Sequence, residues 1–399
     1  MSVAAVAVVA AGAPWESVVV REVEAAESLR LARRCMDVAE LLAVAGVGVD
    51  VAVVDATMTG LNLDAVELLR GRGVLVLGVG ERPRLTALGI EVAVEPGSVA
   101  TTVAEARTSA VASSAGPSSV GPSPAGSIVR PDQPDGPAVA GRLVAVWGPH
   151  GAPGRSTLAL SLASLLSTRE STLLVDADVY GGSQAQQVAL LDDVSGLLAA
   201  ARSANRGDGA AITDHTVAVG ERLDLLSGVV NAQMGASLRP AAVERVLEQV
   251  RRAYSQVVAD CGFGLDAAGP PPQRDEVTLR LLRGADVVVV VGRADPVGLA
   301  RLVRGLHDVR EVTHAEPVVV LNRVRSGLGW SPRELVSTVR RLAGVEPAVL
   351  VPEDPATVDA AVMAGRPPTS DGASSPFGAA VRELADRIAR PAVTSSTRA

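Results

Sequence analysis

A glycine-rich loop between an apolar strand and an apolar helix constrains this chain more than any other feature. The loop reads Gly-Pro-His-Gly-Ala-Pro-Gly-Arg-Ser from Gly148 to Ser156, after an apolar stretch at 143–147 and before another at 158–166. A strand, loop and helix in this order surround an anion with backbone N–H groups and the positive end of a helix dipole. Since the Ser156 hydroxyl stands where such loops ligate Mg²⁺, the sequence predicts an α/β domain that binds phosphate.

The same loop lacks the lysines that phosphate-binding loops normally carry. Arg155 occupies the usual lysine position, and Pro149 stands where the first glycine is expected. All 37 residues counted as Lys or Arg are arginine, so the substitution follows the usage of the whole chain. A guanidinium is nevertheless broader and planar, whereas an ammonium is a compact point charge. We therefore expect phosphate binding to survive better than catalysis.

Composition narrows the class of protein. With 399 residues the chain is long enough for two domains, and its net charge of -7 with few aromatic residues gives no general signature of nucleic-acid binding. Cys35 and Cys261 fit neither a disulfide scaffold nor a zinc site, so reduced, buried thiols are expected. The apolar start at 2–9 lacks a basic flank and indicates a buried strand instead of a signal peptide.

A Pro-, Ser- and Gly-rich stretch divides the chain. Residues 109–140 contain too few large apolar side chains to fold, so we expect a flexible linker there. Strands and helices alternate on both sides of it, which predicts parallel sheets with helices on both faces. The expected order is a flavodoxin-like domain at 1–108, the linker, a doubly wound domain at 141–390 and a frayed tail at 391–399.

The N-terminal domain resembles a response-regulator receiver domain. Five strands are expected at 3–9, 29–33, 49–54, 74–79 and 91–94, with a last helix at 99–107. Asp55 closes the third strand and is followed by Met58 and Gly60, as around the phosphorylated aspartate of receivers. The resemblance implies a receiver-shaped docking domain.

The residues that receivers need for phosphoryl transfer are missing. Ala10 and Gly12 stand in the region of the acidic pair, Gly78 replaces the hydroxyl after the fourth strand, and Glu95 replaces the lysine before Pro96. Without metal ligands or that lysine, little would stabilise phosphoryl transfer to Asp55. We expect a degenerate receiver in which Asp55 is a strand-end carboxylate.

Several motifs follow the glycine loop in a fixed order. They are Thr172 to Asp178 with two carboxylates, Ser255 to Asp260 as a strand ending in aspartate, buried strands at 286–292 and 317–321 before Asn322, and Pro352-Glu-Asp354 before Ala-x-x-x-Gly-x-Pro. Side chains at i and i+2 of a strand face one way, so Asp176 and Asp178 can reach one site. The set resembles the MinD/ParA family of deviant-Walker P-loop ATPases over 141–390.

Within that family, five segments look most similar to the TadZ/CpaE branch: Asp178-Val-Tyr-Gly-Gly182, Val188-Ala-Leu-Leu-Asp-Asp193, Ser195-Gly-Leu-Leu198, Leu225-Leu-Ser-Gly228 and the expected helix from Pro240 to Tyr254. A degenerate receiver joined by a linker to a MinD-like ATPase is also the architecture of that branch, whose members place Tad-type pilus assembly or septum machinery. The resemblance implies a cytoplasmic positioning ATPase at the inner face of the membrane, at a pole or septum. It implies ATP and Mg²⁺ as cofactors, a nucleotide-dependent homodimer, partners from pilus assembly or cell division, and contact with the membrane only through those partners.

The resemblance also assigns roles to individual residues. The phosphates would lie among His150, Gly151, Ala152, Pro153, Gly154, Arg155, Ser156 and Thr157. Ser156, Asp176 and Asp260 would hold the metal and its water, while Asp178 would orient the attacking water and Arg155 would contact the phosphates. Asn322 would read the adenine, with Pro352 and Asp354 closing over the base. The family's signature lysine corresponds to His150, so slow hydrolysis is expected.

Other interpretations remain for these residues. Asp176 or Asp178 could cap a strand end, Asn322 could be a turn residue, and Ser156 a helix N-terminal hydroxyl. A non-hydrolysing scaffold and a ParA-like DNA-segregation protein are the alternative functions. DNA is not expected, because acidic residues interleave with the arginines of the helices, and the segment 377–389 is expected to pack on its own domain.

Overall fold

The computed structural model describes residues 3–10, 12–113, 140–190, 194–207, 211–266, 274–370 and 374–389, without the side chains of 109–113. Within these ranges the chain forms two compact α/β units, one built mainly from the elements before the glycine loop and one mainly from the rest. Residues 114–139 of the predicted linker and the whole predicted tail at 391–399 lie outside the described residues.

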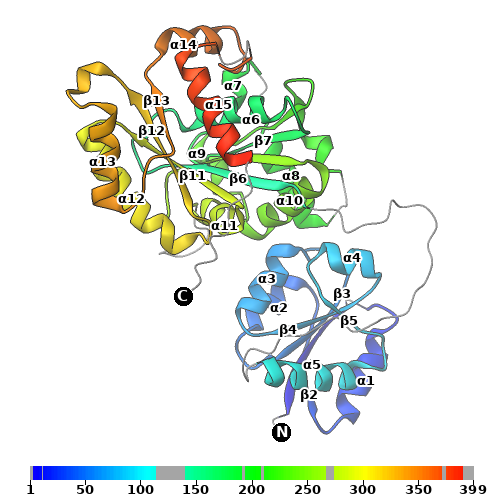
Figure 1. Ribbon diagram of the computed structural model, residues 1–399. Helices are drawn as coiled ribbons and strands as arrows, with labels where there is room; N and C mark the ends of the chain where they lie inside the picture. Colours follow the sequence, from blue (N-terminus) through cyan, green and yellow to red (C-terminus); the bar gives the residue numbers. More distant parts are fainter. Residues whose placement is uncertain are drawn as a thin grey trace, which may run out of the picture. The chain divides into compact units, whose positions relative to one another are not determined.

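The N-terminal unit is a parallel sheet with helices on both faces (Figure 1). Its elements are β1 (Ala4–Val9), α1 (Glu16–Ala25), β2 (Leu29–Cys35), α2 (Val38–Val44), β3 (Val51–Asp55), α3 (Leu63–Gly71), β4 (Leu75–Val79), α4 (Arg82–Ala87), β5 (Val92–Ala93) and α5 (Val99–Ser113). The strand order β2-β1-β3-β4-β5 is the flavodoxin-like order, which confirms the predicted fold class. The predicted last helix continues beyond Arg107 to Ser113.

Two hydrophobic clusters, one on each face, hold this sheet between its helices. Side chains that alternate along each strand are divided between the clusters, so that Val6 and Val8 face α1 and α5 while Ala7 and Val9 face α2 and α3. Every residue of β1 is buried, which explains why the chain starts as a continuous apolar run instead of an alternating one.

The C-terminal unit contains the second, larger sheet (Figure 1). Its strands are β6 (Arg142–Trp147), β7 (Thr172–Ala177), β8 (Val217–Ala218), β9 (Leu223–Leu226), β10 (Gln256–Cys261), β11 (Val287–Arg293), β12 (Pro317–Val324) and β13 (Val349–Pro352). Its α-helices are α6 (Arg155–Leu166), α7 (Gln184–Gln187), α8 (Gly196–Arg206), α9 (Ala232–Gly235), α10 (Pro240–Ala253), α11 (Glu276–Gly284), α12 (Pro296–Val312), α13 (Pro332–Ala343), α14 (Pro355–Met363) and α15 (Pro376–Ala389). Two short 3-10 helices, η1 (Ile212–His215) and η2 (Ser326–Leu328), complete it.

This sheet has the order β13-β12-β11-β6-β10-β7-β9-β8. Its described strands are parallel except at one edge, where β8 runs antiparallel to β9. The sequence predicts only parallel strands, and the difference has a simple cause. Residues 219–222 between β8 and β9 are too few for the crossover that a parallel pair requires, so the chain can only turn back.

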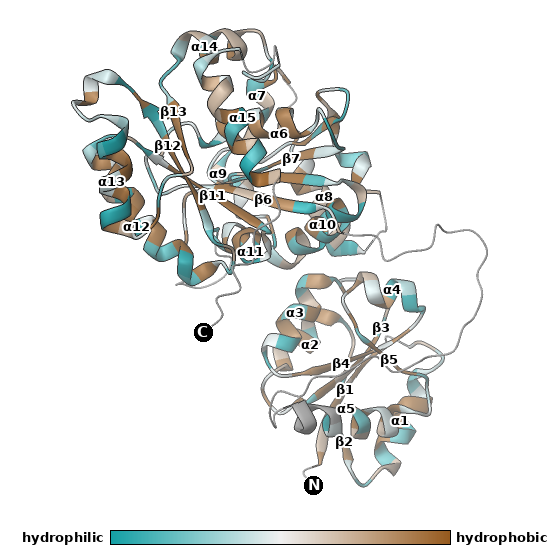
Figure 2. Cartoon of the chain, in the orientation of Figure 1, coloured by the Kyte–Doolittle hydropathy of each residue, from teal (hydrophilic) through white to brown (hydrophobic). Residues whose placement is uncertain are grey.

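The core of the C-terminal unit explains its apolar segments. The central strands β6 and β11 are strongly hydrophobic (Figure 2), and α6 is buried on nearly every side, which is why its sequence shows no polar face. In α15, Phe377, Val381, Leu384 and Ile388 join the same core, which confirms the prediction that this segment packs on its own domain. Both cysteines are free and buried, as expected.

Candidate functional site

The glycine loop lies where several strand ends meet. β10 pairs with β6 on one side and β7 on the other, and Asp260 of β10 is in register with Asp176 of β7. Because parallel strands end at the same edge of a sheet, these carboxylates lie beside the loop that follows β6. The helix after the loop starts at Arg155.

Two glycines allow the loop to take its shape. Gly151 has φ +76° and Gly154 has φ +88°, values that side chains disfavour. A Cβ at Gly154 would collide with Nδ2 of Asn322, and one at Gly151 would collide with the guanidinium of Arg301. Gly151 lies within a turn in which the Ala152 N–H donates to the Pro149 carbonyl (3.0 Å). The loop is therefore a backbone cradle packed closely by its neighbours.

Arg155 does not extend freely from this cradle. Its Nη1 donates to the Gly148 carbonyl at 2.8 Å, and its Nη2 lies 3.5 Å from Oδ2 of Asp178. Both side chains are mostly buried. The residue predicted to contact phosphate and the residue predicted to orient water are thus paired with each other, so a phosphate must compete with Asp178 for the guanidinium.

Asp176 and Asp260 are almost completely buried carboxylates. Oδ1 of Asp176 accepts the Asp178 N–H at 3.3 Å, and Oδ2 accepts the Gln184 N–H at 3.0 Å. Burial, and then the charge of Asp260, raise the pKa of Asp176. Burial also raises the pKa of Asp260, although hydrogen bonds from Ser156 and Gln184 oppose that shift. Burial and mutual repulsion therefore disfavour the ionised forms of the pair, and a bound cation would favour them.

The chemistry of these groups fits Mg²⁺. Oδ1 of Asp260 is buried and has no hydrogen-bond partner in the described part of the chain, and the nearby Ser156 hydroxyl lowers the pKa of the same carboxyl group. Within the described ranges no three His, Cys, Asp or Glu side chains form a complete metal site. Mg²⁺ is usually held by one or two carboxylates together with substrate phosphates, so an incomplete protein set is the expected one.

Gln184 is a site residue that the sequence did not reveal. Its side chain is fully buried at the start of α7, and its Nε2 donates to Oδ2 of Asp260 (2.8 Å) and to the Ser156 carbonyl (3.0 Å). Its position eight residues after Asp176 matches no spacing rule, because the intervening segment is irregular. The one sequence signal for a role of Gln184 is its position as a longer polar residue between Ser183 and Ala185.

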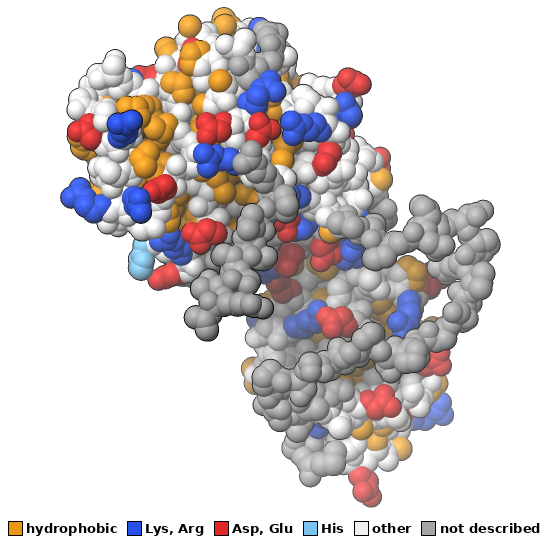
Figure 3. Space-filling model, viewed as in Figure 1, with side chains coloured by type: hydrophobic (Ala, Val, Ile, Leu, Met, Phe, Trp, Pro, Cys, Tyr) orange, Lys and Arg blue, Asp and Glu red, His pale blue; other side chains and the backbone are white. Residues whose placement is uncertain are grey.

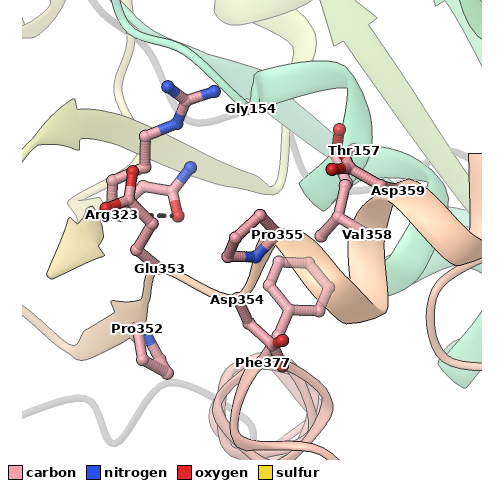
Figure 4. Close-up of a pocket in the computed structure, with 11 residues that line it drawn as sticks. Gly154, Thr157, Arg323, Pro352, Glu353, Asp354, Pro355, Val358, Asp359 and Phe377 are labelled. Carbon is pink, nitrogen blue, oxygen red and sulfur yellow. Dashed lines mark hydrogen bonds between the residues drawn. The ribbon is translucent and has the colours of Figure 1, made fainter. Parts of the chain in front are cut away.

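A pocket of about 180 Å³ adjoins the loop on the side of β12 and β13. Gly154, Thr157, Asn322, Pro352 and Asp354 contribute to its lining. Figure 4 shows Pro355, Val358 and Phe377 gathered on one side of it, with Arg323 and Glu353 on the other. An apolar wall opposite polar groups suits a flat heterocycle. Asn322, Pro352 and Asp354, the residues expected to hold the base, thus line one pocket.

Asn322 is tied to the loop rather than free. Its Nδ2 donates to the Pro153 carbonyl at 2.9 Å, and its Oδ1 accepts the Arg323 N–H at 2.9 Å. Reading a base through this amide would require these bonds to be exchanged. The amide instead connects β12 to the loop.

In the N-terminal unit, Asp55 ends β3 as the sequence predicts. Its Oδ2 accepts the indole N–H of Trp15 at 2.9 Å, and its Oδ1 accepts both the N–H (2.8 Å) and the hydroxyl (2.6 Å) of Thr57. Partial burial raises the pKa of Asp55, but the bonds from Thr57 and Trp15 outweigh it and lower that pKa overall. The carboxylate is therefore stabilised as an anion by neutral donors.

Comparison with solved structures identifies the fold of the C-terminal unit. A scan against protein-family models and a search of curated proteins give no match. Among solved structures, the chain is similar to the cell division ATPase MinD of Pyrococcus furiosus, with 20% identity and a TM-score of 0.51 over 62% of this chain and 98% of that chain. It is also similar to a ParA family ATPase from Chlorobium tepidum, with 17% identity and a TM-score of 0.54 over 62% and 99%. A third structure is the septum site-determining protein MinD of Pyrococcus horikoshii complexed with Mg-ADP, with 19% identity and a TM-score of 0.50 over 62% and 96%.

The C-terminal unit has the MinD/ParA fold. The MinD/ParA arrangement brings the residues singled out by the sequence into two adjoining groups. Ser156, Asp176, Asp178 and Asp260 surround the start of α6, and Asn322, Pro352 and Asp354 line the pocket next to it. These comparisons do not indicate a TadZ/CpaE branch or a receiver.

Proposed function

We propose that the chain is an ATP-binding positioning protein of the MinD/ParA type, and a slow ATPase. The observation that carries this proposal is the backbone cradle from Gly151 to Ser156, which begins a buried helix beside Asp260 and opens onto the pocket next to Asn322. A helix N-terminus of this kind favours phosphate, and the adjoining pocket is suited to a base. The site therefore matches both ends of a nucleotide.

The roles of the individual residues follow from their positions. The adenine would lie against the wall formed by Pro355, Val358 and Phe377, and the phosphates would lie over the loop. Ser156 and Asp260 would hold Mg²⁺, which supplies charge neutralisation for the phosphates when it is bound. The MinD of Pyrococcus horikoshii holds Mg-ADP, which supports this assignment.

Calorimetric titration of the full chain with ATP and ADP, with and without Mg²⁺, tests the proposal. We expect saturable binding that Ser156→Ala weakens in the presence of Mg²⁺ but not in its absence. Ser164→Ala, on the same helix, is the matched control, because its side chain is not part of the loop. No binding of either nucleotide under any of these conditions would refute the proposed function.

A non-hydrolysing scaffold is the second candidate, and one contact favours it. Asp178, the residue assigned to the attacking water, is paired with Arg155. If the pair persists in the nucleotide complex, water is not oriented and the nucleotide only stabilises the fold. Binding without release of phosphate would support this scaffold.

The machinery that the protein positions is also part of the proposal. We assign it to pilus-assembly (Tad-type) or septum proteins, with a nucleotide-dependent homodimer as the active form and a degenerate receiver as the docking unit. Basic and acidic side chains are intermingled on the face of the C-terminal unit seen in Figure 3, which supports a protein partner over DNA. In the described residues no helix is both long and apolar enough to cross a bilayer.

Microscopy of a fluorescent fusion in the native cell separates these roles. Foci at a pole or septum that disappear with Ser156→Ala support positioning. Fluorescence over the nucleoid, together with DNA binding by the purified protein that high salt abolishes, supports a DNA-segregation role.

A further inference from the structure

A second cavity, of about 280 Å³, lies at the opposite end of the glycine loop. Its lining includes the aromatic side chains of Trp147 and Phe263 and the charged side chains of Arg301, Arg304 and Asp308, which project from α12. His150, the residue in place of the family's signature lysine, forms its rim. This cavity is not the base pocket, which adjoins Gly154 at the other end of the loop.

Arg301 reaches from α12 to the loop itself. Its Nη1 donates to the His150 carbonyl at 3.2 Å, and the same nitrogen lies where a side chain on Gly151 would project. The guanidinium is thus held against the backbone of the loop by a residue distant in the sequence. No loop motif would reveal it.

The arginines near the loop differ in whether they form an ion pair. Arg155, the cation within the loop, is already paired with Asp178. Within the described part of the chain, no carboxylate forms an ion pair with Arg301 or Arg304, although Asp308 also lines the cavity. The positive charge next to the loop that forms no ion pair is therefore on α12. The exposed Arg301 side chain can turn toward an anion by giving up its hydrogen bond to the His150 carbonyl, without breaking an ion pair.

We propose that Arg301 is a second phosphate-binding residue, which contacts the terminal phosphate of a nucleoside triphosphate at the His150 end of the loop. This inference rests on the proposed nucleotide site and adds the residue that distinguishes a triphosphate from shorter nucleotides. Arg301 gives the loop a cation at the end where its own sequence has His150. Arg304, one turn along α12, adds to the positive potential without a contact to the loop.

Affinities of the full chain for ATP, ADP, AMP and inorganic tripolyphosphate test this assignment. Arg301→Gln should weaken ATP and tripolyphosphate binding about tenfold, the effect of losing one charge-assisted contact, and should leave AMP binding unchanged. Arg301→Lys should recover part of the loss. The matched control is Arg310→Gln on the same helix, whose guanidinium contacts Ala343 and Glu316 instead.

The outcomes separate this inference from the proposed function. Equal ATP affinity in wild type and Arg301→Gln, with both folded by circular dichroism, overturns the inference alone. Tripolyphosphate binding that depends on Arg301, without ATP binding, supports the inference and refutes the nucleotide function. Binding of neither ATP nor tripolyphosphate overturns both.

Discussion

The side-chain amide of Gln184 donates a hydrogen bond of 2.8 Å to the Asp260 carboxylate, and the same nitrogen donates one of 3.0 Å to the Ser156 carbonyl. One buried amide thus joins three segments: the start of α7, the start of α6 and the end of β10. Because Gln184 is fully buried, water cannot replace these bonds.

Replacing Gln184 should destabilise the C-terminal unit. Gln184→Leu keeps similar volume but leaves an oxygen of Asp260 and the Ser156 carbonyl without this donor. Each unsatisfied buried group costs about 1–3 kcal/mol, so a total loss of about 2–6 kcal/mol is expected in urea unfolding. Gln186→Leu, at an exposed position of the same helix, should change the free energy of unfolding little. Equal losses in the two variants would contradict the role of the amide.

The buried carboxylate pair predicts a pH dependence of stability. The pKa of Asp176 is raised in the folded state, first by burial and then by Asp260. The folded state therefore binds the proton more tightly than the unfolded chain, so the free energy of unfolding rises as pH falls from above the raised pKa toward the ordinary carboxyl value of about 4. Without Mg²⁺, Asp176→Asn should be more stable than wild type above the raised pKa.

This advantage of Asp176→Asn should shrink as the pH is lowered. Thermal unfolding in EDTA between pH 8 and pH 5 measures it, and a shift of a few degrees corresponds to about 1 kcal/mol in a domain of this size. Asp214→Asn, at an exposed position, controls for the change in net charge. A difference between Asp176→Asn and wild type that stays constant with pH would contradict this prediction.

The order of strands and helices could be predicted from the sequence, because the central strands are continuous apolar runs and the glycine loop marks the end of β6. The edge hairpin could not, since β8 has only Val217–Ala218 and carries no pattern. The same contrast holds for the site. Ser156 and Asp260 follow a spacing fixed by strand and loop geometry, whereas Gln184 and Arg301 reach the loop through tertiary packing.

The Gly154 position tests how closely the loop is packed. Gly154→Ala introduces a Cβ at φ +88° and against Nδ2 of Asn322, so we expect a loss of about 1–3 kcal/mol in the free energy of unfolding. Adding Asn322→Ala removes the collision but not the backbone strain, so the double variant should be more stable than additivity predicts. Gly327→Ala, in open space at an ordinary φ, is the control. Strict additivity would show that the amide does not press on the loop.

Asp55 should not accept phosphate. Its oxygens are occupied by Trp15 and Thr57, and Glu95 stands where a receiver has lysine. Incubation with acetyl phosphate and Mg²⁺ should therefore leave the intact mass of the chain unchanged. Stoichiometric addition of a phosphoryl group, lost in Asp55→Asn, would show that the N-terminal unit is a working receiver.

The proposed ATP turnover should depend on positions 150 and 155, where the glycine loop lacks lysine. The guanidinium of Arg155 is held between the Gly148 carbonyl and Asp178, so it cannot act as a compact charge at the terminal phosphate while Asp178 orients water. Lysine at 155 would present one ammonium and release Asp178, and lysine at 150 would add a charge where His150 lies at the rim of the loop. The backbone cradle proposed to bind the phosphates is the same in the wild type and in this double variant.

We therefore expect His150→Lys with Arg155→Lys to raise the rate of ATP hydrolysis at least about tenfold, equivalent to about 1.4 kcal/mol of barrier. Asp178→Ala should remove the gain, because the water is then no longer oriented. Arg169→Lys, at an exposed position after α6, controls for the change from arginine to lysine. The rate of phosphate release at saturating ATP is the measurement. A double variant that binds ATP and remains inert would favour the scaffold, whereas a wild type as fast as the double variant would mean that Arg155 leaves Asp178 once nucleotide is bound.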